Sequence, residues 1–209
     1  MTDWAQLYRD HVDAVGAMAA DLTDDDLTTT VPATPAWTVH NVIAHLAGCP
    51  ADMISGRMDG APSPAWSERH VGERAGLPVA GLVAEIRDST DALIETFEGV
   101  DRPAAVWNIA VHHADLHEAL GRGELAPPLW LPVLEGAAPL KLSEQPVTIH
   151  AGDATYGAGG PEIDVPPYEL FRAVFTRRSR SQIAAWAGDN VDPDQIGVFG
   201  GRDDDQPVP

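Results

Sequence analysis

Residues 108–116 read NIAVHHADL, and this short stretch sets polar side chains along the edge of an apolar helical face. Successive residues of an α-helix are about 100° apart, so His112 lies at the edge of the apolar stripe. Asn108 lies one turn before His112 and Asp115 close to one turn after it, which brings the three residues to one side of the helix. The stretch therefore predicts a helix with a polar site on the margin of its buried face.

A second helix carries a histidine in an equivalent position. Apolar residues recur at helical spacing from about residue 38 to about residue 58, and Gly48 and Pro50 lie where they can bend the helix. His45 lies at the edge of this apolar stripe. If the two helices pack together, both imidazoles point into the crevice between them, which is how helical bundles build metal sites.

The first part of the chain contains four stretches with helical periodicity, separated by connections that contain proline or glycine. The predicted helices cover residues 3–22, 38–58, 79–97 and 104–121. The connection over residues 59–78 holds many helix breakers, with one short helix predicted over residues 67–74. This pattern predicts a four-helix bundle in residues 1–125.

The composition changes in residues 126–209, and the pattern there predicts a small α/β region. Short β-prone pieces alternate with many prolines and glycines as far as residue 167. Two helices are predicted over residues 168–175 and 179–187, and the acidic residues 203–209 are predicted to form a solvated tail. The fold class is therefore α+β, with the bundle followed by this smaller region.

The charge balance argues against polyanionic partners. The formal net charge is −19, from 32 acidic and 13 basic side chains. Binding to nucleic acid or to anionic membranes needs lysine and arginine to replace counterions, and this surface would mostly repel phosphate. No apolar run approaches the roughly 20 residues that a membrane helix needs. We expect a small-molecule substrate as the partner, and neither nucleic acid nor a membrane; the sequence does not fix the oligomeric state.

Cys49 is the only cysteine, so the chain forms no internal disulfide. Its first residues show no basic segment followed by an apolar one, so we expect no secretory signal. Both observations favour a reducing compartment, and we expect the protein in the cytoplasm. As a buried side chain, Cys49 would act as a small hydrophobe; one turn after His45, it is also placed to act as a soft metal ligand or nucleophile.

Three groups of motifs, in order along nearly the whole chain, resemble the mycothiol-dependent maleylpyruvate isomerase family, a branch of the DinB-like metal-binding bundles. The third group resembles a C-terminal segment that many actinobacterial members carry. The motifs are WTV at residues 37–39 with HLA at 45–47, VHHADL at 111–116 with ALG at 119–121, and PYELFR at 167–172 with RRSR at 177–180.

The resemblance implies a bundle that holds a zinc ion through a histidine on the second helix and an acidic residue plus a histidine on the fourth. His45 and His112 match the two histidines, whereas Asn108 occupies the place of the acidic ligand. An amide oxygen is neutral and a weaker ligand than a carboxylate, so metal affinity should fall. Asp115 or Asp52 could supply the missing oxygen.

The resemblance further implies a low-molecular-weight thiol, typically mycothiol, as cosubstrate. In an isomerase the thiolate adds to an activated double bond, allows rotation and leaves; in related transferases it passes to a small electrophile. Arg177 and Arg178 could bind an anionic substrate, although a basic run at a helix end is also explained by contacts with the helix dipole. The alternatives are a small-ligand-binding or stress-related protein with a weakened or lost metal site, or a metal-independent enzyme. His150, in a predicted strand, has no assigned role.

Overall fold

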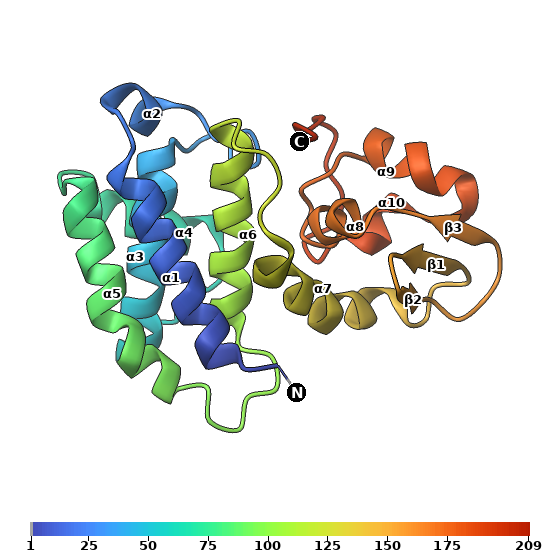
Figure 1. Ribbon diagram of the computed structural model, residues 1–209, viewed down its shortest axis with the longest axis horizontal. Helices are drawn as coiled ribbons and strands as arrows, with labels where there is room; N and C mark the ends of the chain where they lie inside the picture. The colour runs from blue at the N-terminus through green and yellow to red at the C-terminus, as the bar shows by residue number, and fades with distance from the viewer. Residues whose placement is uncertain (1) are drawn as a thin grey trace. The chain divides into compact units, whose positions relative to one another are not determined.

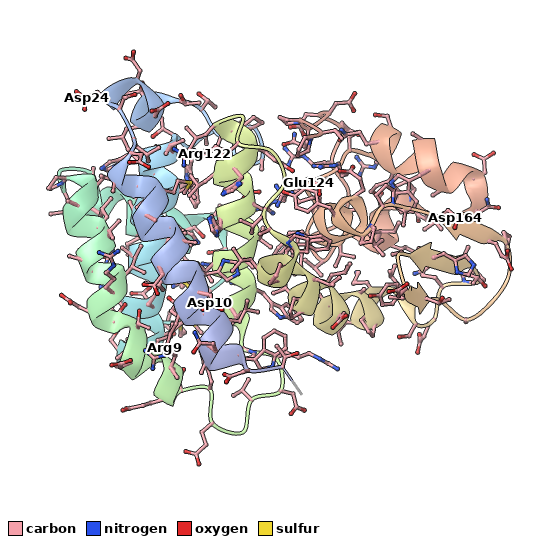
Figure 2. All side chains as sticks on the ribbon, viewed as in Figure 1. Arg9, Asp10, Asp24, Arg122, Glu124 and Asp164 are labelled. Carbon is pink, nitrogen blue, oxygen red and sulfur yellow. The ribbon has the colours of Figure 1, made fainter. Side chains whose placement is uncertain are left out.

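The computed structural model describes residues 2–209, so that only Met1, the first residue of the predicted bundle, lies outside the described residues. The chain divides into two compact units, Met1–Gly123 and Glu124–Pro209. Arg122 and Glu124, labelled in Figure 2, lie on either side of this boundary.

Four long helices form the first unit (Figure 1). Helices α1 and α3 each pack against both α5 and α6, which closes a four-helix bundle and confirms the predicted fold class. Two short helices, α2 (Asp24–Thr28) and α4 (Pro64–Arg74), pack against α3. The bundle helices are α1 (Trp4–Ala20), α3 (Val39–Ser55), α5 (Val79–Glu95) and α6 (Ala104–Ala119).

Local signals set the ends of the helices that surround the site. Thr38 caps α3 in a capping box with Asn41, and Gly56 ends the helix in the left-handed conformation at φ 75°. Helix α4 starts three residues before the predicted residue 67, because the Ser63 hydroxyl accepts from the Trp66 amide and Pro64 suits the first helical turn.

The bundle core is built from the apolar stripes of the four helices. These side chains are between 0 and 2% exposed, and each contributes roughly 1.5–3 kcal/mol by leaving water. Arg9, labelled in Figure 2, pairs with Asp91 across α1 and α5 at an exposed position, where an ion pair stabilises little. Core members include Val15, Val42, Ile43, Leu46, Leu82, Ile86, Leu93, Val106, Ile109 and Leu116.

The second unit combines helices with a small mixed sheet (Figure 1). Strand β1 (Thr148–Ala151) is central; it pairs antiparallel with β2 (Ala154–Tyr156) and parallel with β3 (Glu162–Asp164). The helices are α7 (Pro127–Leu142), α8 (Pro167–Val174), α9 (Arg180–Ala187), the 3₁₀ turn Gly188–Asn190 and α10 (Pro193–Ile196).

Helix α7 corrects the sequence prediction, which gave this segment only breakers and β-prone pieces. Two of its prolines stand in the first turn, where they are tolerated, but Pro132 and Pro139 lie inside the helix. Burial overrides this cost: the Trp130 ring packs against Tyr168 and stacks on Phe171 of α8, with centroids 5.3 and 5.7 Å apart.

The acidic end of the chain is also less solvated than predicted. The Asp205 carboxylate accepts hydrogen bonds from the Ser179 and Ser181 hydroxyls, and the Gln182 side chain donates to the Gln206 carbonyl oxygen at 2.7 Å. Gln206 is 5% exposed. These bonds tie the segment to the first turn of α9, within the second unit. No helix among residues 2–209 is both long and apolar enough to cross a membrane.

Candidate functional site

Helices α3 and α6 face each other in the bundle and bring two histidines together. The ring centroids of His45 on α3 and His112 on α6 are 5.0 Å apart, with the rings 77° from parallel. Both side chains are buried, at 3% and 8% exposure. Two imidazoles at this separation can ligate one metal ion between the helices.

Asn108 lies beside His45, one turn before His112 on α6. Its Oδ1 atom is 3.2 Å from His45 Nε2. Two ligands bound at about 2.1 Å in a tetrahedral site are themselves about 3.4 Å apart. The separation between the His45 nitrogen and the Asn108 oxygen therefore suits two ligands of one metal ion.

Asp115 contacts His112 from within the same helix. Its Oδ2 atom lies 3.0 Å from His112 Nδ1, and its side chain is fully buried. An imidazole whose Nδ1–H donates a hydrogen bond to a carboxylate can coordinate a metal through Nε2, and the carboxylate fixes the ring orientation. The structure thus gives Asp115 an orienting contact with His112; its use as a substitute ligand remains a prediction.

His70 on α4 also contacts the site and was not singled out from the sequence. Its Nδ1 atom lies 3.1 Å from His45 Nδ1, and its Nε2 atom lies 2.9 Å from Asp52 Oδ2. Arg69 binds both oxygens of the same Asp52 carboxylate. His70 lies in a breaker-rich segment without a strong apolar stripe, so periodicity gives no signal that it reaches α3.

Charge and burial set the ionisation of this cluster. Burial alone would raise the pKa of Asp52, but hydrogen bonds from Arg69 and His70 outweigh it and lower the pKa to about 2. Burial also lowers the pKa of His70; the charges of Arg69 and Arg74 act in the same direction, whereas Asp52 opposes them. At neutral pH the cluster therefore contains an ionised Asp52 and a neutral His70.

Two tryptophans flank His45. The Trp37 ring centroid is 5.1 Å from that of His45 and 6.2 Å from that of His112, and Trp66 meets His45 edge-on at 6.0 Å. Trp37 also lines an open pocket of about 200 Å³. The other lining residues are Thr34, Pro35, Ala36, Pro64 and Glu68.

The remaining residues singled out from the sequence have internal partners. Arg178 forms a two-pronged ion pair with Glu169, at 2.6 and 2.7 Å, and Arg177 donates to the Phe175 carbonyl oxygen. Cys49 is buried, and burial together with the Asp52 charge raises its pKa to about 12, as expected of a small core residue.

Two further histidines have their own contacts. His150 lies on β1, where its Nδ1 atom is 3.4 Å from the Thr155 hydroxyl. His113, next to His112, points elsewhere in the bundle: its Nδ1 atom lies 3.1 Å from His11 Nδ1 on α1. Burial, reinforced by His11 and His117, lowers the pKa of His113 to about 2, which keeps it neutral.

The donor set at the site is thus two imidazoles and an amide. Within residues 2–209, no three or more histidine, cysteine, aspartate or glutamate side chains are grouped so as to hold a metal. Asp52 and Asp115 bond to the histidines rather than standing beside Asn108. Imidazole nitrogens and an amide oxygen are groups that can bind a divalent metal, and an amide is a weaker ligand than a carboxylate.

Comparison with known proteins gives consistent results. The family described as "Mycothiol maleylpyruvate isomerase N-terminal domain" matches residues 8–123, more than half of the chain. The crystal structure of the mycothiol-dependent maleylpyruvate isomerase is similar in fold, at a TM-score of 0.53 and 13% identity, over 84% of this chain and 88% of that one. A histidine-to-alanine mutant of that enzyme matches over the same shares at 0.52 and 13%. No curated protein sequence matches the chain.

Proposed function

This chain belongs to the mycothiol maleylpyruvate isomerase family, and on that premise we propose that it is a metal- and thiol-dependent isomerase or transferase of a small electrophile. The observation that carries the proposal is the approach of His45 and His112, 5.0 Å apart between α3 and α6, with Asn108 3.2 Å from His45. The cytoplasm is the proposed location, because a low-molecular-weight thiol stays reduced there.

In this proposal His45, His112 and Asn108 hold a zinc ion. When bound, zinc would lower the pKa of a thiol such as mycothiol and present a nucleophile at neutral pH. Asp115 holds the His112 ring in place through its contact with Nδ1. The surrounding helices keep bulk water from the two buried imidazoles.

The pocket beside Trp37 supports a small substrate. A volume of about 200 Å³ is below the range typical of drug-sized ligands, and most of the lining is apolar. Glu68 at its margin disfavours an anionic group at that point. The sequence offers Arg177 and Arg178 as candidates to bind an anionic group, and that role stays a prediction.

Asn108 favours a second candidate function. If the neutral amide lowers metal affinity below the level available in the cell, the chain keeps the bundle and binds a small ligand without catalysis. The two functions differ in a measurable way, since only the enzyme depends on both zinc and thiol.

The test is an assay of thiol-dependent isomerisation with mycothiol and maleylpyruvate, together with a panel of small electrophiles for transfer. We expect turnover that requires both added zinc and thiol, and that is lost in His45→Ala. Turnover unchanged by chelators would contradict the metal-dependent function. Ligand binding without turnover would favour the second candidate.

A further inference from the structure

A series of close polar contacts leads from α4 into the proposed metal site. Asp52 Oδ2 lies 2.9 Å from His70 Nε2, His70 Nδ1 lies 3.1 Å from His45 Nδ1, and His45 Nε2 lies 3.2 Å from Asn108 Oδ1. Both nitrogens of His70 are therefore engaged. We propose that Asp52 and His70 are positioning residues that fix the proton of His45 on Nδ1, so that its Nε2 lone pair points toward Asn108 and a bound metal.

The chemistry of the contacting groups decides which atom donates and which accepts in each hydrogen bond. An ionised carboxylate only accepts hydrogen bonds, so His70 Nε2 must donate to Asp52. A single proton lies between the two Nδ1 atoms of His70 and His45. A positive His70 would be fully buried beside the guanidinium groups of Arg69 and Arg74, and close to the proposed metal. His70 is therefore the acceptor, and His45 donates from Nδ1.

This proton order leaves two acceptors facing each other at the site. His45 Nε2 and Asn108 Oδ1, 3.2 Å apart, repel unless a cation lies between them or the amide turns its NH₂ group inward. A metal satisfies both atoms. The same order excludes the competing tautomer, in which a proton on Nε2 would have to leave before a metal could bind.

The packing of α4 on α3 holds His70 in this place. A Cβ atom at Gly48 would lie 2.5 Å from both Cβ and Cγ of His70, so only glycine lets the imidazole approach this closely. The Trp66 ring packs edge-on against the other side, with centroids 4.2 Å apart. A histidine that only filled the core would be satisfied by Asp52 alone; here the second nitrogen reaches a proposed metal ligand.

The test begins with the tautomer of His45 in the metal-free wild-type protein, read by nitrogen-15 NMR of labelled histidine. We expect a protonated Nδ1 and an unprotonated Nε2. In Asp52→Asn the amide can donate to His70, which reverses the proton order and places the proton on His45 Nε2. A protonated Nε2 in the wild type, or an unchanged tautomer in folded Asp52→Asn, would overturn the proposal.

Zinc affinity provides the second readout. We expect Asp52→Asn and His70→Phe to weaken zinc binding by roughly 10–100-fold, the usual effect of losing a partner behind a ligand. Glu73→Gln is the matched control, because Glu73 pairs with Arg57 and Arg69, the two arginines that also pair with Asp52. The zinc affinity of this variant should stay within about twofold of the wild type. Circular dichroism and thermal unfolding establish that each variant is folded.

The outcomes separate this inference from the function on which it rests. If the wild type binds zinc and both folded variants bind it equally well, the positioning role is wrong and the proposed metal site stands. If the wild type shows the expected tautomer but binds no zinc, the hydrogen-bonded order is right, and the metal-ligand role fails together with the proposed function.

Discussion

At the scale of single residues, we expect Asn108 to set the metal affinity of the proposed site. Its amide oxygen lies 3.2 Å from His45 Nε2, in the place where the family resemblance puts an acidic ligand. A carboxylate there would add a negative charge to a buried pair of imidazoles, whereas the amide adds none. We therefore expect the amide to give a lower metal affinity than a carboxylate would.

Asn108→Glu should restore that charge. We expect zinc to bind at least about tenfold more tightly, because a carboxylate is the stronger ligand. Competition with a chromophoric chelator measures the change. Asn108→Ala should weaken binding, and unchanged affinity in both variants would show that residue 108 does not touch the metal.

Cys49 should be chemically silent in the folded protein. Burial and the Asp52 charge raise its pKa to about 12, so almost no thiolate exists at pH 8 and reagents cannot reach the sulfur. Mass spectrometry after iodoacetamide treatment should show no adduct in native protein and full modification in guanidinium chloride. Rapid modification of the native protein would contradict this account and reopen a chemical role for the thiol.

At the scale of elements, the contact between α3 and α4 places His70 against His45 of the proposed site. Gly48 makes room on α3 for His70, and Asp52 ties Arg69 and His70 of α4 to the same helix. Neither residue lies in the proposed ligand set. Changes at this contact should therefore reach the metal through stability and orientation.

Gly48→Ala should destabilise the protein. The added methyl group would meet His70 carbons at 2.5 Å and an Arg74 nitrogen at 2.9 Å, an overpacking that costs roughly 1–3 kcal/mol. Gly72→Ala on α4 is the control, since nothing lies within 4 Å and alanine favours a helix by about 1 kcal/mol. Urea unfolding should move the two midpoints in opposite directions; equal shifts would refute the close approach.

Asp52 should make the contact sensitive to acid. Its folded-state pKa of about 2 lies below the ordinary 3.8, so its stabilisation is present above pH 4 and is lost as the pH falls toward 2. The difference corresponds to about 2 kcal/mol. Urea unfolding of wild type and Asp52→Asn should differ at pH 7 and converge near pH 2; a gap that persists at low pH would point to packing instead.

The spacing of apolar residues predicts helices that bury one face. It does not predict helices or contacts that depend on residues distant in the sequence. The four bundle helices and the approach of His45 to His112 follow from apolar stripes in the sequence. Helix α7 was not predicted, because its interior prolines oppose a helix and only the packing of Trp130 on α8 reveals why one forms. His70 was not predicted either, because its partners lie on α3, 18 and 25 residues away in sequence.

At the scale of the whole molecule, two compact units share one chain, and the family match covers most of the first. The proposed metal ligands lie in that unit, on two facing helices. The net charge of −19 makes nucleic acid and anionic membranes unfavourable partners, which stays a prediction. The metal-site proposal therefore concerns the first unit alone.

Elemental analysis of the protein purified without an affinity tag tests the metal site most directly. The wild type, incubated with zinc and desalted, is compared with the double variant His45→Ala/His112→Ala. Near-stoichiometric zinc in the wild type and none in the variant is the result that this account predicts. Equal zinc in both proteins, or none in either, would contradict a metal site between α3 and α6.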